Sequence, residues 1–246
     1  MTRIFVGFDD TDTLEAERGT GKLARWYAEA LPDSCTVWGV IRQQLLVHPD
    51  IPFTSHNSAA CVVIDTPDAS VLPALVDLGI THLERHMIAG SDPGLCVAAA
   101  DTPARQRLEA FGARAAVEVV TQEDAHAAAA GVHLSGHGGT NDGVIGAAAG
   151  VGLTMGGWSG RFIEFGKVRG WPTVVPVADL EGAGILVVPV DRNVVAPAPG
   201  NRVDTQDWLR PRLWGGRAVL PVVSEGGGRW TAIARRAPDP RESQEV

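Results

Sequence analysis

The first twelve residues of the chain run an apolar strand directly into a cluster of acidic side chains. Residues 4–8 (IFVGF) are typical of a buried β-strand, and Asp9, Asp10 and Asp12 follow them. Three carboxylates at the end of one strand repel one another, so a folded protein tolerates them best with a positive charge among them. A hard divalent cation, often carried with nucleotide phosphates, meets this need. The sequence therefore predicts magnesium and nucleotide binding at this edge of a sheet.

A simpler interpretation of the acidic cluster needs no metal. An Asx turn followed by a helix N-cap would employ one or two of the carboxylates. The third carboxylate would then have no function, so the metal-site interpretation is favoured.

Composition and charge narrow the class of protein. The 246 residues are 45% hydrophobic and 20% charged, which is ordinary for a globular protein of one large or two small domains. The formal net charge is −8 and no basic stripe stands out. A surface that grips nucleic-acid phosphates normally shows such a stripe, so RNA binding is disfavoured.

Cysteine usage and the first residues indicate the compartment. Cys35, Cys61 and Cys96 are widely spaced and form no C-x-x-C pair, so we expect reduced thiols and no zinc knuckle. The chain starts directly in a strand, without a signal peptide, and has no apolar run long enough to cross a bilayer. A cytoplasmic protein without membrane contact is expected.

Hydrophobic periodicity predicts helices that alternate with strands in the first 150 residues. Helices are predicted at 22–31, 71–78, 104–111, 122–130 and 144–151, and strands at 4–8, 36–41, 59–64, 95–99 and 116–120. This alternation indicates a layered α/β (α+β) fold whose sheet is mixed or largely parallel.

The pattern changes after residue 153. Short β-like segments follow at 160–168, 173–177, 185–190 and 218–223. We expect a first domain over residues 1–153, a smaller α+β domain over 154–236, and a disordered Pro- and charge-rich tail over 237–246.

The segment 19–22 (GTGK) invites comparison with a Walker A motif, but the motif fails. Ala16 stands where that motif needs glycine, and Leu23 stands where it needs a magnesium-binding hydroxyl. What remains is a helix start that presents backbone N–H groups, Thr20 and Lys22 close to the acidic strand end, which suits phosphate. A simple loop-to-helix entry explains these residues equally well.

A second glycine-rich segment, residues 136–143, precedes an apolar helix and is the better phosphate-binding candidate. Asn141 and Asp142 could instead cap that helix. Arg42 and the polar run 54–58 (TSHNS) supply a cation and hydrogen-bond donors near strand ends, where sites in α/β proteins tend to lie.

Two histidines flank this glycine-rich segment. His133 and His137 are four residues apart, but no predicted helix contains them, so we do not expect them to bind a metal as a pair.

Four segments, taken in order, resemble motifs of the archaeal tRNA-isoleucine agmatidine synthetases (TiaS), which join agmatine to a tRNA cytidine with ATP. They are residues 9–12 (DDTD), Arg42 with 49–59 (PDIPFTSHNSA), 92–94 (DPG) and 138–147 (GGTNDGVIGA). Four ordered motifs are much more specific than any one alone.

This resemblance implies a kinase-like ATP-binding domain without a Walker A motif, followed by a shortened ferredoxin-like domain. It also implies that Asp9, Asp10 and Asp12 hold magnesium on the triphosphate, and that Thr20 lies near the threonine the family phosphorylates. The glycine loop would contact phosphate, and the second domain would help to bind an amine.

The sequence also departs from the family. Counterparts of its RNA-binding OB domain and zinc ribbon are not found, and Asn57-Ser58 replaces an Asn-Gly step. Together with the acidic net charge, these differences favour a small-molecule or amine substrate over tRNA.

We therefore expect a TiaS-like ligase or kinase-like phosphotransferase that uses ATP and Mg²⁺. The catalytic candidates are Asp9, Asp10, Asp12, Thr20 and Lys22. The cofactor-binding candidates are Gly19, Gly21, Arg42, His56, Asn57, Gly138, Gly139, Thr140, Asn141 and Gly143. Two alternatives stay open: a non-catalytic nucleotide or amine sensor, and a tRNA cytidine-modifying enzyme whose RNA-binding part is a separate chain.

Overall fold

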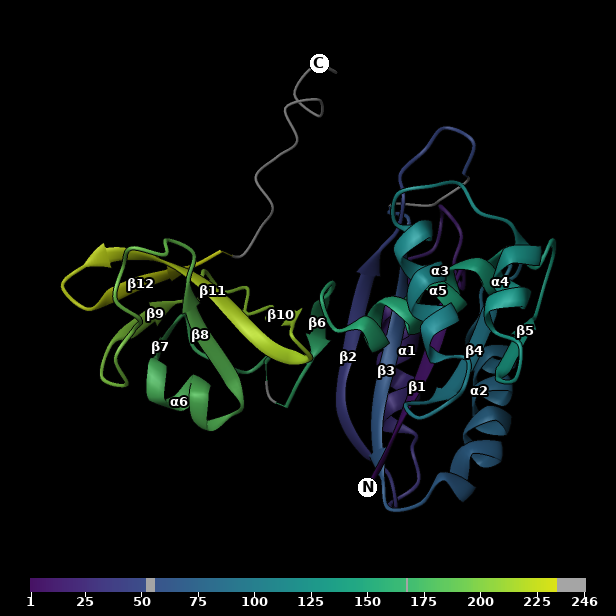
Figure 1. Ribbon diagram of the computed structural model, residues 1–246, viewed down its shortest axis with the longest axis horizontal. Coiled ribbons are helices and arrows are strands. Elements are labelled where there is room, and N and C mark those ends of the chain that lie inside the picture. The colour runs from purple at the N-terminus through teal and green to yellow at the C-terminus, as the bar shows by residue number, and fades with distance from the viewer. Residues whose placement is uncertain (52–55, 167, 234–246) are drawn as a thin grey trace. The chain divides into compact units, whose positions relative to one another are not determined.

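The structure is a computed structural model that describes residues 1–51, 56–166 and 168–233. It divides into two compact units, Met1–Phe165 and Gly166–Val246, and each is treated by itself (Figure 1). The expected boundary after residue 153 falls inside helix α5 (Gly143–Gly156). The expected tail, and residues 52–55 of the second motif, lie outside the described residues.

The first unit is built on one sheet with the strand order β5-β4-β1-β3-β2-β6. Its strands are β1 (Thr2–Asp9), β2 (Thr36–Gln44), β3 (Ser58–Thr66), β4 (Gly94–Ala99), β5 (His133–Gly136) and β6 (Arg161–Glu164). All neighbouring pairs in this unit are antiparallel, so the largely parallel alternative is wrong for it. The expected mixed pairing is confirmed for the chain, because parallel pairs occur after residue 184. Strands β1 and β2 do run in one direction, as their helical crossover requires, but β3 returns between them.

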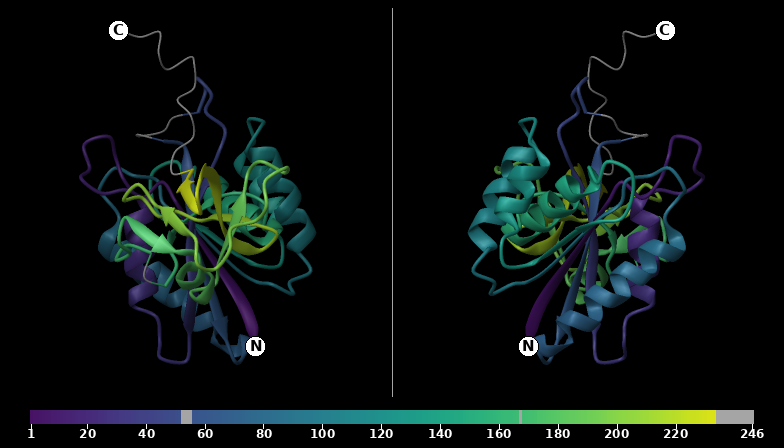
Figure 2. Two further views of the ribbon diagram at one scale, coloured as in Figure 1. Left: turned by 90° about the vertical axis from the view of Figure 1, so that its left-hand side faces the viewer. Right: turned by 90° about the vertical axis from the view of Figure 1, so that its right-hand side faces the viewer.

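Helices cover both faces of this sheet, which confirms the layered α/β class (Figure 2). They are α1 (Thr20–Glu29), α2 (Leu72–His86), α3 (Arg105–Ala115), α4 (Gln122–Ala128) and α5, with a 3₁₀ turn at Ala69–Val71 before α2. Alternate residues of β1 pack in a buried cluster with Tyr27 of α1 and Leu83 of α2. The opposite face of β1 meets α5 at Gly7. Because both faces are covered, the strand reads as a continuous apolar run.

Small residues let α5 lie directly on the sheet. A Cβ on Gly7 would fall 2.4 Å from the Ala147 carbonyl oxygen, so helix and strand backbones touch there. Farther along α5, a Cβ on Gly152 would meet the Leu108 carbonyl oxygen of α3. The alanine- and glycine-rich sequence of this helix is therefore a packing requirement.

In the first unit, one predicted strand is absent and one observed strand was not predicted. Residues 116–120 are irregular, because α3 continues to Ala115 and leaves Val117 and Val119 exposed. Strand β5 was missed because it has four residues and alternates polar with apolar side chains too briefly to be recognised.

The second unit is mainly β-structure. It contains β7 (Val174–Pro176), helix α6 (Val177–Gly182), β8 (Ile185–Pro189), β9 (Arg202–Asp204), β10 (Arg212–Trp214), β11 (Arg217–Gly226) and β12 (Arg229–Ala232). The order is β10-β11-β12-β9-β7, and β8 pairs in parallel with β11. A ferredoxin-like unit has two helices in a β-α-β-β-α-β order. The described residues of this unit contain only α6, so they depart from that pattern.

None of the helices in the described residues is long and apolar enough to span a membrane.

The contact between β1 and α5 generates a stability prediction. Gly7→Ala should lower the free energy of unfolding by about 1–3 kcal/mol, because the new Cβ overpacks against the Ala147 carbonyl. Gly156→Ala is the matched control, since a Cβ at that helical position meets nothing within 4 Å. The control should raise stability slightly. Urea unfolding of both variants measures the difference, and equal stabilities would show that α5 does not rest on β1 as described.

Candidate functional site

A cavity of about 240 Å³ opens in the first unit beside the end of β1. Six of its lining residues are acidic: Asp9, Asp10, Asp12, Asp50, Glu118 and Asp142. No lysine or arginine lines it among the residues that the structure describes. The cavity therefore concentrates negative charge and suits a cation.

Asp9 is the most deeply placed of these acids. It follows Gly7 on the α5 side of β1, and its carboxylate lies against Gly146 in the first turns of α5. A Cβ on Gly146 would fall 1.7 Å from the Asp9 Oδ2, so only glycine leaves room for this carboxylate. Burial, followed by the charge of Asp10, raises the pKa of Asp9 to about 7.

Asp10 holds an unusual backbone conformation beside it. Its φ of 51° lies in the left-handed region, which aspartate tolerates better than most residues but which still costs free energy. Burial, and then the charge of Asp92, raises the pKa of Asp10 to about 6, with smaller contributions from Asp12 and Asp142. A strained acid among other acids is a feature typical of functional sites.

Thr20 brings a buried hydroxyl to the same cavity. Its Oγ1 donates a hydrogen bond to Asp12 Oδ1 at 3.2 Å and accepts one from the Thr11 hydroxyl at 3.1 Å. The side chain is 7% exposed, at the first residue of α1. A hydroxyl whose proton already points to a carboxylate is arranged for proton transfer if its oxygen attacks an electrophile.

The capping explanation of these acids is not what the structure shows. Helix α1 begins after Gly19 and has no side-chain cap, so none of the three acids caps it. Asp142 is at the N-cap position of α5 but makes no capping bond; its Oδ1 accepts a hydrogen bond from Gln122 Nε2 at 2.6 Å.

The predicted glycine loop is tied to Asp92. The Thr140 backbone N–H and hydroxyl donate to the two Asp92 carboxylate oxygens at 3.0 and 2.9 Å. Gly139 has a φ of +48°, and a Cβ there would overlap Asp92. Asn141 also lies in the left-handed region. Asp92 therefore holds the glycine loop through hydrogen bonds, and the same carboxylate raises the pKa of Asp10 in the cavity.

The structure places only some of the predicted site residues in the cavity lining. Asp9, Asp10, Asp12, Thr20, His56 and Asn57 line it, with His56 exposed. The predicted residues outside the lining are Gly19, Gly21, Lys22, Arg42, Gly138, Gly139, Thr140, Asn141 and Gly143.

Two predicted cations have other neighbours. The Lys22 Nζ lies 5.2 Å from the centroid of the Trp26 ring, and its side chain is exposed. Arg42 Nε donates to Ser58 Oγ at 2.9 Å, and Ser58 lines the cavity. Burial, followed by the charge of Arg161, lowers the pKa of Arg42. Arg42 thus reaches the site through Ser58, whereas Lys22 does not reach it.

The cavity has an apolar wall that sequence reasoning missed. It is formed by Leu45, Ile51, Ala115, Val119, Val120 and Ile145. Residues 116–120 were assigned to a strand, so Glu118 and Val119 had no predicted place at a site. Asp50 belongs to the second motif, but its neighbours in sequence are also those of an ordinary solvent-exposed loop, so it could not be recognised as a site residue.

The acidic residues suit a metal ion that is bound jointly by the protein and a phosphate ligand better than one coordinated by protein side chains alone. Among the described residues, no three His, Cys, Asp or Glu side chains converge closely enough to hold a metal ion. Magnesium usually takes only one or two carboxylates and completes its shell with water and phosphate. The donor set at Asp9 and Asp10 suits that mode, and the metal ligation by Asp9, Asp10 and Asp12 stays a prediction.

Comparison with known proteins identifies the fold. No family model and no curated protein matches the chain. Among solved structures, TiaS in complex with its isoleucine tRNA and ATP is 26% identical with a TM-score of 0.53, over 62% of this chain and 36% of that chain. The chain is TiaS-like in fold. Apo TiaS, an agmatidine synthetase for isoleucine tRNA, is 25% identical with a TM-score of 0.50, over 61% and 35%.

A tRNA fluorescent labelling enzyme matches at 26% identity and a TM-score of 0.51, covering 61% of this chain and 36% of that chain. The chain thus corresponds to about a third of the length of the structures it matches. The TiaS-like resemblance read from four motifs is confirmed at the level of the fold.

The raised pKa of Asp9 generates a pH-dependent prediction. Unfolded Asp9 ionises near pH 3.8, and the folded residue only near 7, so the folded state binds the extra proton between these values and loses stability as pH rises. Asp9→Asn should therefore be more stable than the wild type by about 2–4 kcal/mol at pH 8, and by almost nothing at pH 4.

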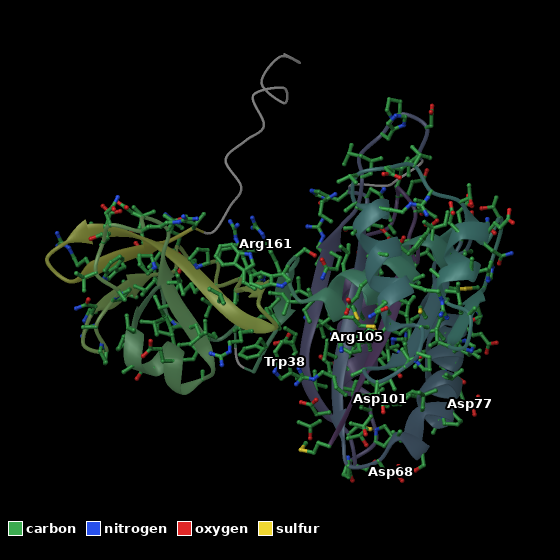
Figure 3. The ribbon with its side chains drawn as sticks, viewed as in Figure 1. Trp38, Asp68, Asp77, Asp101, Arg105 and Arg161 are labelled. Atoms are coloured by element: carbon green, nitrogen blue, oxygen red, sulfur yellow. The ribbon has the colours of Figure 1, made fainter. Side chains whose placement is uncertain are left out.

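Chemical unfolding at both pH values, without metal or nucleotide, measures this difference. Asp101→Asn changes an exposed aspartate and should show neither effect (Figure 3). Equal stability of Asp9→Asn and wild type at pH 8 would mean that the charge of Asp9 is already neutralised.

Proposed function

We propose that the first unit is an ATP- and magnesium-dependent enzyme that transfers the terminal phosphoryl group of ATP to an oxygen. The observation that carries this proposal is the Thr20 hydroxyl, hydrogen-bonded to Asp12 in the cavity that also holds Asp9 and Asp10. The TiaS-like fold supports the choice of nucleotide, since one similar structure is a TiaS complex with tRNA and ATP.

The residues around the cavity would bind different parts of the magnesium–ATP complex. Asp9 and Asp10 would hold magnesium, which neutralises charge on the transferring phosphoryl group when bound. The apolar wall of Val119, Val120 and Ile145 would seat the nucleoside, and the phosphates would lie toward the magnesium held by Asp9 and Asp10. Catalysis here is mainly positioning and electrostatic stabilisation.

Thr20 would accept the phosphoryl group first. Its Oγ1 attacks the terminal phosphorus, the bond to the bridging oxygen breaks, ADP leaves, and the hydroxyl proton passes to Asp12. The phosphoryl group would then pass to an oxygen of the acceptor. An amine that displaces the phosphate would complete a ligase reaction, and the acidic cavity suits such a cation.

The acceptor defines two versions of the function. A small molecule is favoured by the net charge of −8. A tRNA acceptor, with RNA-binding parts on a separate chain, is favoured by the isoleucine tRNA bound in similar structures. Release of ADP or inorganic phosphate stimulated by unfractionated tRNA supports the second version, and stimulation by a small-metabolite pool alone supports the first.

The phosphoryl step predicts the behaviour of two variants. Thr20→Ala should abolish a covalent phosphoprotein, because it removes the attacking oxygen. Asp12→Asn should slow its formation by roughly 100-fold or more, because the carboxylate no longer takes the proton. Intact-mass spectrometry after incubation with ATP and Mg²⁺ measures both.

Thr13→Ala is the matched control, since Thr13 lies in the same loop but does not line the cavity. A phosphoprotein that survives in Thr20→Ala would remove this residue from the mechanism. Calorimetric binding of ATP and Mg²⁺ by the wild type with no turnover would instead favour a nucleotide sensor.

A further inference from the structure

Three polar side chains form a row along the edge strand β5 and the residue that follows it, outside the lining of the acidic cavity. His133 Nε2 and His137 Nε2 each lie 2.8 Å from the same oxygen, the Ser135 Oγ. A serine hydroxyl carries one proton, so it cannot donate to both imidazoles. At least one ring must therefore present its Nε2–H to this oxygen, and the row can be satisfied in more than one way.

The register of β5 places this row on the face of the sheet that α2 covers. Ser135 pairs with Leu95 and His133 pairs with Val97 of β4. Leu95 contacts α2, because a Cβ on Gly79 would lie 2.9 Å from its side chain. Antiparallel partners share a face. Asp9 faces α5, so the row and the Asp9 carboxylate lie on opposite faces of the sheet.

The surroundings of the row favour a cation over an anion. Asp77 of α2 raises the pKa of His133, and Glu84 of α2 raises the pKa of His137, so a carboxylate acts on each ring (Figure 3 labels Asp77). Burial nevertheless lowers both pKa values below the usual 6.5. The imidazoles are therefore neutral at pH 7, which is the form that binds metals.

We propose that His133 and His137 bind one divalent transition-metal ion, such as Zn²⁺, Ni²⁺ or Cu²⁺, at the position now taken by the Ser135 hydroxyl. Imidazole nitrogens bind zinc at about 2.0–2.1 Å. Each ring then needs to approach by less than about 1 Å. The hydroxyl leaves by rotation about a single side-chain bond, and the backbone of β5 does not move.

The coordination shell is completed by water. No three metal-binding side chains converge here among the described residues, so the protein supplies two nitrogens. All three residues of the row are partly exposed, which leaves room for water on the ion. Asp77 and Glu84 offset the charge of the ion from α2. The imidazole ligands select borderline metals and not Mg²⁺, which prefers oxygen.

The position of the row links this ion to the glycine loop. The His137 N–H donates to the Pro93 carbonyl oxygen at 2.7 Å, and Gly138 follows directly. Bound metal would join the two ends of β5 and hold the residue from which the loop starts. This inference does not depend on the proposed phosphoryl transfer.

Calorimetric titration of the full chain with NiCl₂ tests the site. Excess Mg²⁺ in the buffer competes with nickel for the carboxylates of the acidic cavity, and a Cys35→Ser background removes the partly exposed thiol. We expect one site, with binding at least tenfold weaker in His133→Ala and in His137→Ala. Ser135→Ala should bind as well as the background protein or more tightly, because its hydroxyl occupies the position of the ion.

His86→Ala is the matched control, since His86 belongs to another pair whose ring centroids are 4.6 Å apart, with His82. It should bind nickel like the background protein. Electron paramagnetic resonance of the Cu²⁺ form should show two imidazole nitrogens.

Several results would overturn the proposal. One is the absence of heat, and another is unchanged binding in either His133→Ala or His137→Ala. Equal loss in Ser135→Ala would show that the ion does not replace the hydroxyl. Thermal unfolding without metal separates these results from misfolding, because a variant that unfolds cooperatively near the wild-type temperature retains the sheet.

Discussion

The site depends on the close approach of helix α5 to strand β1. At Gly7 the backbones of helix and strand touch, and at Gly146 the missing side chain leaves room for the Asp9 carboxylate between them. Asp9 ends the strand at this contact, and its carboxylate lies against the helix, where water is scarce. The site needs the ionised Asp9 carboxylate, but burial disfavours the ionised form. This is the reason for the raised pKa of Asp9.

The placement of the acidic residues at the end of β1 lowers the stability of the folded protein. Asp9 and Asp10 lie together without a cation among the lining residues that the structure describes. Asp10 adds a left-handed backbone conformation. Proteins tolerate such strain where the surrounding packing is strong, and the buried residues 4–8 of β1 provide it here. A bound cation would relieve the repulsion, so ligand binding and folding should stabilise one another.

The parts that could be predicted from sequence share a local signal. The apolar run of β1, the acids after it and the glycine-rich start of α5 are each visible within a dozen residues. The cavity wall could not be predicted, because Val119 and Val120 follow α3 in an irregular segment that resembles a strand. Lys22 was misplaced for a related reason: spacing puts it beside Thr20 in the chain, but successive helical residues point in different directions.

The sequence by itself determined the alternation of elements, the buried central strand and the acids at its end, because these follow from hydrophobic period and residue chemistry. Only the tertiary structure decided which acids share a cavity, that Thr20 donates to Asp12, and that His133 and His137 meet at Ser135. The reason is physical. Strand order and register bring Asp9, Asp10 and Asp12 to one cavity with Glu118 and Asp142, and no local pattern encodes so long a separation. The contacts of Thr20 and of the two histidines are short in sequence, but they depend on side-chain conformations that the packed structure selects.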